Sequence, residues 1–163
     1  MTSRTDRLPA VAIVTGGSGW EGQEVVRGLT RWGWPSVIAY LEQQPRVDEA
    51  VAEIVDAGGT TVAVRADLED DLDVQRLFAE SVAVFGGVDV VVHTTMDDAA
   101  RLYHHAARYV RSHGMIVTTS SAASVAPPVA ARLRERGITV ERATPREVLA
   151  VLDRWRRQSA RRG

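Results

Sequence analysis

The stretch AVAIVTGGSGWEG, residues 10–22, contains the signal that decides the fold. Its first part, Ala10–Thr15, is a short apolar run rich in Val and Ile, which is typical of a strand buried on both faces. Residues 16–22 include four glycines, and beyond them apolar residues recur at helical spacing as far as Leu29. A strand, a glycine turn and a helix within about thirty residues predict the opening of a βαβ unit.

The same alternation continues along the chain. Short β-prone runs lie at 37–41, 61–65, 88–92, 115–119 and 138–142, and apolar residues between them recur at helical spacing. Because strands that alternate with helices build a parallel sheet covered on both faces, we predict an α/β, doubly wound sheet of six parallel strands. No repeat or linker interrupts the pattern, so we expect a single domain over 1–163, frayed at 1–8 and 159–163.

The composition excludes several classes of function. The net charge of −1 gives no global electrostatic argument for a nucleic-acid or anionic-membrane partner. The chain has no cysteine, which excludes disulfides, thiolate metal sites and thiol nucleophiles and makes a cytoplasmic location the default expectation. No apolar stretch is long enough for a signal peptide or a membrane span. All 20 basic residues are arginine, so no lysine can take part in catalysis, and asparagine is also missing.

The glycine turn predicts an anion site. Residues 17–22 read G-x-G-x-x-G directly after the first strand and at the start of the first helix, where free N–H groups attract a dinucleotide diphosphate. Glu21 lies in the first helical turn, and its carboxylate can satisfy the helix dipole itself. Like charges a few ångströms apart cost about 1–4 kcal/mol. Two outcomes stay open: a bound dinucleotide, or a turn that Glu21 caps and that binds none.

Further stretches carry a family resemblance. They are IVTGGS at 13–18, ADL at 66–68, FGGVD at 85–89, and GMIV at 114–117 leading to the two serines at 120–121. Together they resemble the short-chain dehydrogenase/reductase family. The resemblance implies a Rossmann fold that binds NAD or NADP. It places Gly16, Ser18, Gly19, Gly22, Asp67 and Leu68 at the cofactor, with Asp67 on the adenine amino group, and Ser121 at the substrate carbonyl.

The departures from that family concern proton transfer. Its Tyr-x-x-x-Lys pair belongs after Ser121, yet residues 122–138 contain neither tyrosine nor lysine. Its Asn-Asn-Ala-Gly after the fourth strand is replaced by HTTM at 93–96. Because the tyrosine is the family's general acid and the lysine lowers its pKa, we do not expect ordinary carbonyl reduction.

Other residues are candidates for the proton transfer that the missing Tyr-Lys pair would perform. His93 follows the fourth strand with Asp97 nearby, so either could act as acid or base beside Ser121; a strand-end histidine that only bonds a carboxylate is the alternative. Glu42 lies about twenty residues after Gly22, near the place where an acid selects NAD, and no arginine there would bind a 2′-phosphate, so the lean is to NAD over NADP. A plain solvent-facing glutamate is the favoured interpretation of Glu42 itself. No residue spacing indicates a metal site.

Three hypotheses for function remain at this point. The first is an NAD(P)-binding protein of oxidoreductase descent, in which any hydride chemistry relies on Ser121 and His93. The second is a non-redox enzyme that dehydrates, cyclises or isomerises a small metabolite in the same crevice. The third is a noncatalytic subunit or homo-oligomer that uses Trp20, Trp32 or Trp34 as a protein-binding surface.

Overall fold

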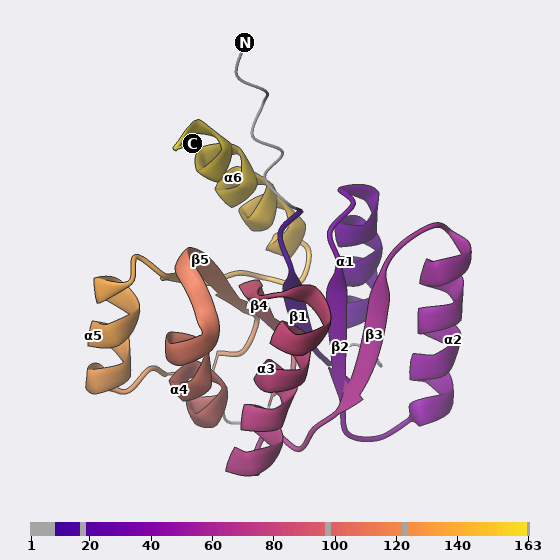
Figure 1. The fold of residues 1–163 in the computed structure, drawn as a ribbon, viewed down its shortest axis with the longest axis horizontal. Helices are drawn as coiled ribbons and strands as arrows, with labels where there is room; N and C mark the ends of the chain where they lie inside the picture. Colours follow the sequence, from indigo (N-terminus) through magenta and orange to yellow (C-terminus); the bar gives the residue numbers. More distant parts are fainter. Residues whose placement is uncertain (1–8, 17–18, 97–98, 122–123, 163) are drawn as a thin grey trace.

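The chain folds into one six-stranded sheet with helices on both faces. The computed structural model describes residues 9–162 apart from 17–18, 97–98 and 122–123. In chain order the elements are β1 (Ala12–Thr15), α1 (Trp20–Arg31), β2 (Ser36–Tyr40), α2 (Gln44–Asp56), β3 (Thr61–Arg65), α3 (Asp71–Phe85), β4 (Val88–His93), α4 (Ala100–Tyr109), β5 (Val110–Thr118), α5 (Pro127–Glu135), β6 (Thr139–Arg142) and α6 (Val148–Arg161), as Figure 1 shows.

The sheet confirms the predicted topology. Its strand order is β3-β2-β1-β4-β5-β6, and every neighbouring pair is parallel. The order reverses between β1 and β4, so the carboxyl ends of these two strands meet where doubly wound folds bind ligands. All six predicted strands are present with shifts of a few residues at their ends. The largest shift is at β5, which begins at Val110 because that residue already pairs with Val88.

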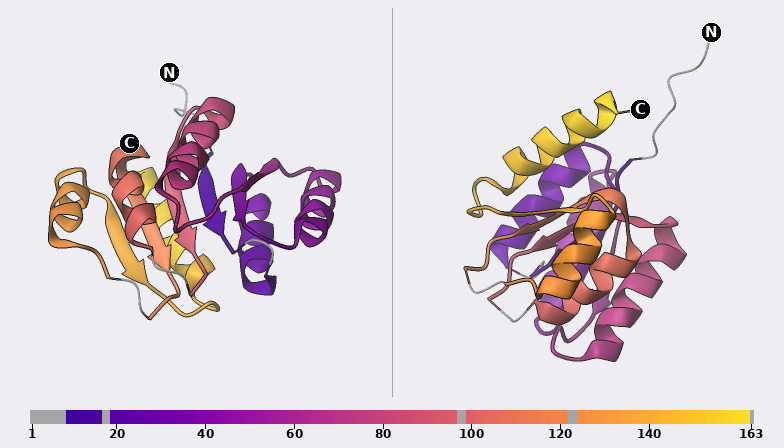
Figure 2. Two further views of the ribbon diagram at one scale, coloured as in Figure 1. Left: turned by 90° about the horizontal axis from the view of Figure 1, so that it is seen from below. Right: turned by 90° about the vertical axis from the view of Figure 1, so that its left-hand side faces the viewer.

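Two apolar clusters hold the helices to the sheet. One joins α3, α4 and α5 to one face through residues such as Leu77, Phe78 and Leu102. The other joins α1, α2 and α6 to the opposite face through residues such as Val26 and Leu152. Figure 2 shows the sheet between these layers. Strands β1 and β4 are almost completely buried, as their unbroken apolar runs predict.

The last helix reaches into the stretch where fraying is expected. Helix α6 continues through Arg161, while 1–8 and 163 lie outside the described residues. The helix is held because it packs closely on α1: a Cβ on Gly28 would lie 2.5 Å from the Leu149 side chain. Tight contact of this kind favours an ordered final helix.

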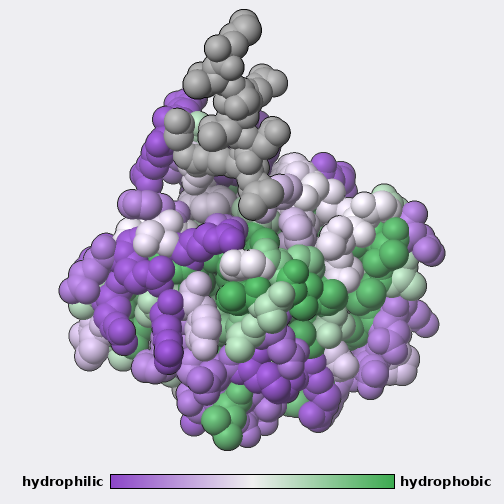
Figure 3. Space-filling view, viewed as in Figure 1, coloured by the Kyte–Doolittle hydropathy of each residue, from purple (hydrophilic) through white to green (hydrophobic). Residues whose placement is uncertain are grey.

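None of the helices that the structure describes combines the length and apolarity needed to cross a bilayer. In Figure 3 hydrophilic residues dominate the lower and left margins, and hydrophobic residues gather toward the middle of the visible face.

Candidate functional site

A cavity of about 440 Å³ opens at the carboxyl ends of β1, β2 and β3. It is lined by Thr15, Gly16, Ala39, Tyr40, Leu41, Glu42, Gln43, Ala66, Asp67, Leu68, Glu69 and Thr95. Three of the six residues that the sequence assigned to a cofactor, Gly16, Asp67 and Leu68, therefore line one hollow. A concave site beside the switch in strand order is the usual ligand position in this architecture.

The glycine turn closes tightly against the end of β4. Gly16 has φ +73°, in the left-handed region that glycine adopts without strain. A Cβ at this position would lie 2.4 Å from Thr94 Oγ1, and that hydroxyl donates a 2.6 Å hydrogen bond to the Thr15 carbonyl. Because no side chain fits here, the backbone is exposed to whatever occupies the cavity.

The beginning of α1 supplies the rest of the turn. The Gly19 N–H donates to the Gly16 carbonyl at 2.9 Å, and Gly19 is the N-cap of α1 without a side chain of its own. Gly22 is buried in the first turn of the helix. Glu21 is half-buried in the first turn, so its carboxylate lies at the positive end of the helix dipole. Ser18 lies outside the described residues.

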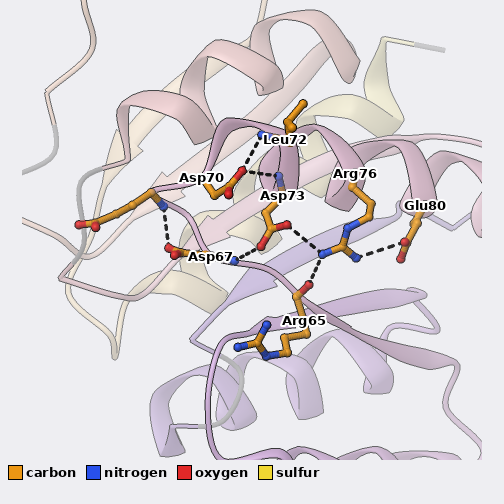
Figure 4. A network of polar contacts seen from close by, with 8 residues as sticks. Arg65, Asp67, Asp70, Leu72, Asp73, Arg76 and Glu80 are labelled. Atoms are coloured by element: carbon orange, nitrogen blue, oxygen red, sulfur yellow. Dashed lines mark hydrogen bonds and ion pairs between the residues drawn. The ribbon is translucent and has the colours of Figure 1, made fainter.

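The loop after β3 is held from both sides, as Figure 4 shows. The Asp67 N–H donates to Asp73 Oδ2 at 2.9 Å, and the Glu69 N–H donates to Asp67 Oδ1 at 3.0 Å. Asp70 caps α3 by accepting from the N–H groups of Leu72 and Asp73. These bonds fix the Asp67 carboxylate at the rim of the cavity.

Asp73 is an anchor for this loop. The hydrogen bond from the Asp67 N–H, assisted by Arg76, holds the pKa of Asp73 below its usual value. Arg76 also donates to the Arg65 carbonyl at 2.6 Å and pairs with Glu80. The charged form of Asp73 therefore ties the first turn of α3 to the loop and to the end of β3.

His93 lies beneath the cavity and is completely buried. Its Nδ1 is 3.1 Å from Thr118 Oγ1 and its Nε2 is 3.0 Å from Thr95 Oγ1. The alternative in which His93 bonds a neighbouring carboxylate stays a prediction, because Asp97 lies outside the described residues. Thr95 lines the cavity and His93 does not, so the hydrogen bond to Thr95 links the imidazole to the cavity wall.

The other catalytic candidates are not gathered at this cavity. Ser121 is exposed in a turn after β5 and does not line it, and Asp97 lies outside the described residues. Tyr103 of α4 is buried with its hydroxyl toward Thr118, but no completed hydrogen bond joins it to another described residue. Burial raises the pKa of Tyr103, which is the wrong direction for a general acid.

Sequence reasoning missed several contributors. Gln43, which lines the cavity, has a left-handed φ of 61°, and nothing in its sequence context indicates this. Asp73 could have been found, because it lies three residues after the N-cap Asp70, where an acidic side chain commonly bonds backbone N–H groups. Within the part of the chain that the structure describes, no cluster of three or more His, Asp or Glu is arranged to hold a metal ion.

Comparison with known proteins is consistent with this geometry. Residues 10–99 match the family model described as short chain dehydrogenase. A hydroxynaphthalene reductase-like protein Arp2 of Metarhizium anisopliae is 31% identical over 137 residues, which cover 70% of this chain and 51% of that protein. The short chain dehydrogenase claC of Passalora fulva is 37% identical over 82 residues, covering 50% and 31%. The chain spans about half the length of the first of these curated relatives.

Solved structures share the fold. A short-chain dehydrogenase from Oenococcus oeni PSU-1 superposes with a TM-score of 0.74 at 15% identity, covering 89% of this chain and 87% of that one. A short chain dehydrogenase from Burkholderia cenocepacia J2315 in complex with NADP superposes with a TM-score of 0.64 at 22% identity, covering 83% and 73%.

Proposed function

The chain belongs to the short-chain dehydrogenase family, and on that premise we propose that it binds a nicotinamide adenine dinucleotide with the adenosine half in the cavity beside Gly16 and Asp67. The observation that carries the proposal is that Gly16 and Asp67 line one cavity at the carboxyl ends of β1 and β3, where Gly16 presents only backbone. When bound, the nicotinamide supplies hydride chemistry.

The residues of this chain fit such a group. The glycine turn runs into the start of α1, where the N–H groups of the first helical turn are the kind of donors that bind a diphosphate. The Asp67 carboxylate, held by the loop bonds, accepts the adenine amino group, and Leu68 lies beside it on the same wall. The family resemblance implied these roles, and the cavity shared by Gly16, Asp67 and Leu68 supports the proposal for those three residues.

The charge of the cavity favours NAD over NADP. Glu42, Asp67 and Glu69 contribute carboxylates to its lining, and none of the lining residues that the structure describes is basic. A 2′-phosphate adds negative charge next to carboxylates, at a cost of about 1–4 kcal/mol for a pair at 4 Å. NADH is therefore expected to bind at least about fivefold more tightly than NADPH.

We propose further that cofactor binding in this chain is not coupled to ordinary carbonyl reduction. Residues 122–138 contain no tyrosine or lysine, and the burial of Tyr103 disfavours that phenol as a substitute. Ser121 is left as a donor to a substrate oxygen, and His93 acts as a positioning residue that orients the Thr95 hydroxyl. An assay of NADH oxidation with a panel of ketones should show no turnover above background; robust reduction would contradict this part.

Calorimetric titration tests the binding site itself. Asp67→Ala should weaken NADH binding about tenfold because a hydrogen bond to a charged acceptor is lost. The matched control, Asp56→Ala, removes an exposed carboxylate at the end of α2 that does not line the cavity, and it should bind as the unchanged chain does. No NADH binding up to about 1 mM, or equal losses in both variants, would refute the proposal and leave the non-redox and noncatalytic hypotheses.

The positioning role of His93 has its own test. His93→Ala removes the partner of Thr95, so NADH affinity should fall, whereas His93→Gln retains one donor and one acceptor and should recover part of it. Equal affinities in the two variants, both folded by circular dichroism, would show that the imidazole does not orient the cavity wall.

A further inference from the structure

A second cavity lies at the opposite end of the sheet, near the amino ends of the strands. Its volume is about 610 Å³. It is lined by Pro9, Ala10, Trp32, Trp34, Asp89, Ser112, His113, Trp155, Arg156, Ser159, Ala160 and Arg162. In Figure 1 this region lies toward the top, where α6 rises beyond the amino ends of the strands. None of these residues belongs to the cavity proposed for the dinucleotide.

The end of α1 brings two indoles together. Gly33 adopts φ +74°, its N–H donates to the Thr30 carbonyl, and the Trp34 N–H donates to the Leu29 carbonyl. This pair of bonds is a Schellman motif, which ends the helix and turns the chain back. It places the Trp32 and Trp34 rings edge to face with centroids 5.3 Å apart. Trp34 is only 5% exposed, so it does not form the exposed surface that the sequence suggested.

A third indole comes from α6 and is fixed in place. The Trp155 ring lies edge to face with Trp34 at 5.8 Å, and its Nε1–H donates to the His113 carbonyl at 3.1 Å. His113 has φ +67°, an uncommon conformation for a residue other than glycine. Strain of this kind often marks a functional position. The aromatic wall is therefore held in one arrangement before any ligand arrives.

The charges around the cavity favour an anion. The Arg156 guanidinium lies over the Trp32 ring at 5.0 Å, and its Nε is buried without a hydrogen-bond partner among the described residues. Asp153 accepts from both Arg156 and Arg157, so one negative charge is shared by two positive charges. Arg162 adds a further positive charge at the lining.

The carboxylate in the lining is already engaged. Asp89 accepts from the Val11 N–H at 2.9 Å and from Arg111 at 3.0 Å, which offsets its charge. The cavity therefore combines flat apolar walls, an unpaired guanidinium N–H and a surplus of arginine. These features are complementary to a ligand with a flat apolar ring and one negative group.

We propose that this cavity binds a planar aromatic carboxylate, whose ring packs against Trp32 and Trp155 and whose carboxylate is recognised by Arg156. The volume lies within the range of small-molecule sites. The site is separate from the dinucleotide cavity, so the proposal does not depend on the function proposed above.

Indole N–H resonances of the full chain provide the test, because the cavity contains three of the four tryptophans. The fourth, Trp20, is 68% exposed at the start of α1, near the carboxyl ends of the strands, and serves as an internal control. In a titration with 2-naphthoate, the indole signals of Trp32 and Trp155 should shift and saturate while that of Trp20 stays in place. The neutral analogue 2-naphthylmethanol should bind at least about tenfold more weakly.

Two variants separate recognition from structure. Arg156→Gln should weaken 2-naphthoate binding about tenfold. The matched control, Arg157→Gln, removes a cation that shares Asp153 but does not line the cavity, and it should change affinity less than about twofold. The proposal is overturned if no indole signal of the cavity saturates by about 5 mM, if the neutral analogue binds equally well, or if both variants behave alike.

Discussion

Replacement of Gly16 by alanine should lower the free energy of unfolding through two separate effects at the mouth of the cavity proposed for the dinucleotide. The first part is the backbone: φ +73° costs a residue with a Cβ about 1–2 kcal/mol. The second is the collision with Thr94 Oγ1 at 2.4 Å, which must displace that hydroxyl from the Thr15 carbonyl. Losing the bond and leaving a buried group without a partner adds about 1–3 kcal/mol.

Gly33→Ala is the matched control. Gly33 has nearly the same φ, +74°, but nothing lies within 4 Å of the added Cβ. It should therefore lose only the backbone part, about 1–2 kcal/mol. Gly16→Ala should lose about 2–5 kcal/mol in all. At about 3 kcal/mol the melting temperature of a domain this size falls by about 6–12 °C.

A double-mutant cycle makes the reasoning refutable. Thr94→Ala alone costs about 1 kcal/mol because its hydrogen bond is lost, but it also removes the atom that the new Cβ strikes. Gly16→Ala and Thr94→Ala should therefore destabilise by at least about 1 kcal/mol less together than the sum of the single variants. The measurement is urea denaturation followed by far-ultraviolet circular dichroism. Additive losses, or equal losses for Gly16→Ala and Gly33→Ala, would refute the collision.

Three further outcomes follow from single side chains. Glu147 accepts from the N–H and hydroxyl of Thr144, which lowers its pKa, so its stabilising effect is complete above its unfolded pKa and is lost as pH falls through the lower folded value. Thermal melts of Glu147→Gln and the unchanged chain should therefore differ at pH 7 and converge as the pH falls below the ordinary glutamate pKa. Asp73→Ala removes the acceptor of the Asp67 N–H, and hydrogen exchange should show that amide losing its protection, while unchanged protection would contradict the anchor. His93→Ala should cost about 3 kcal/mol in urea denaturation through a cavity and the loss of two buried hydrogen bonds, and a loss below about 1 kcal/mol would count against the buried network.

The elements of the fold could be predicted from the chain because their signals are local. Ala12–Thr15 and Val88–His93 are unbroken apolar runs, which is the pattern of strands covered on both faces. Glycines and prolines mark most of the turns between elements, and the alternation of strand and helix restricts the connections to a doubly wound sheet. The boundaries of the elements were harder to predict. Strand β5 begins five residues before the predicted run, because Val110 pairs with Val88 of β4 although the residues after it are not β-prone.

The candidate site was only partly accessible from the sequence. Gly16, Asp67 and Leu68 could be assigned because their motifs are contiguous, and the structure places all three at one cavity. The position of His93 could not be read in the same way, because burial depends on what the neighbouring strands and the following loop place over it. Its two threonine partners come from β5 and from the loop after β4, so only the folded sheet brings them together.

The chain by itself determined the type and order of the elements, the glycine turn and the absence of a Tyr-Lys pair between residues 122 and 138, since these depend on residues close together in the sequence. Tertiary structure alone decided which polar groups meet. The carboxylates of Glu42 and Asp67 share a cavity because β2 and β3 end side by side, and Trp34 and Trp155 share another because α6 packs against α1. Contacts between distant segments depend on strand order and helix packing, and neither is encoded in any single stretch of residues.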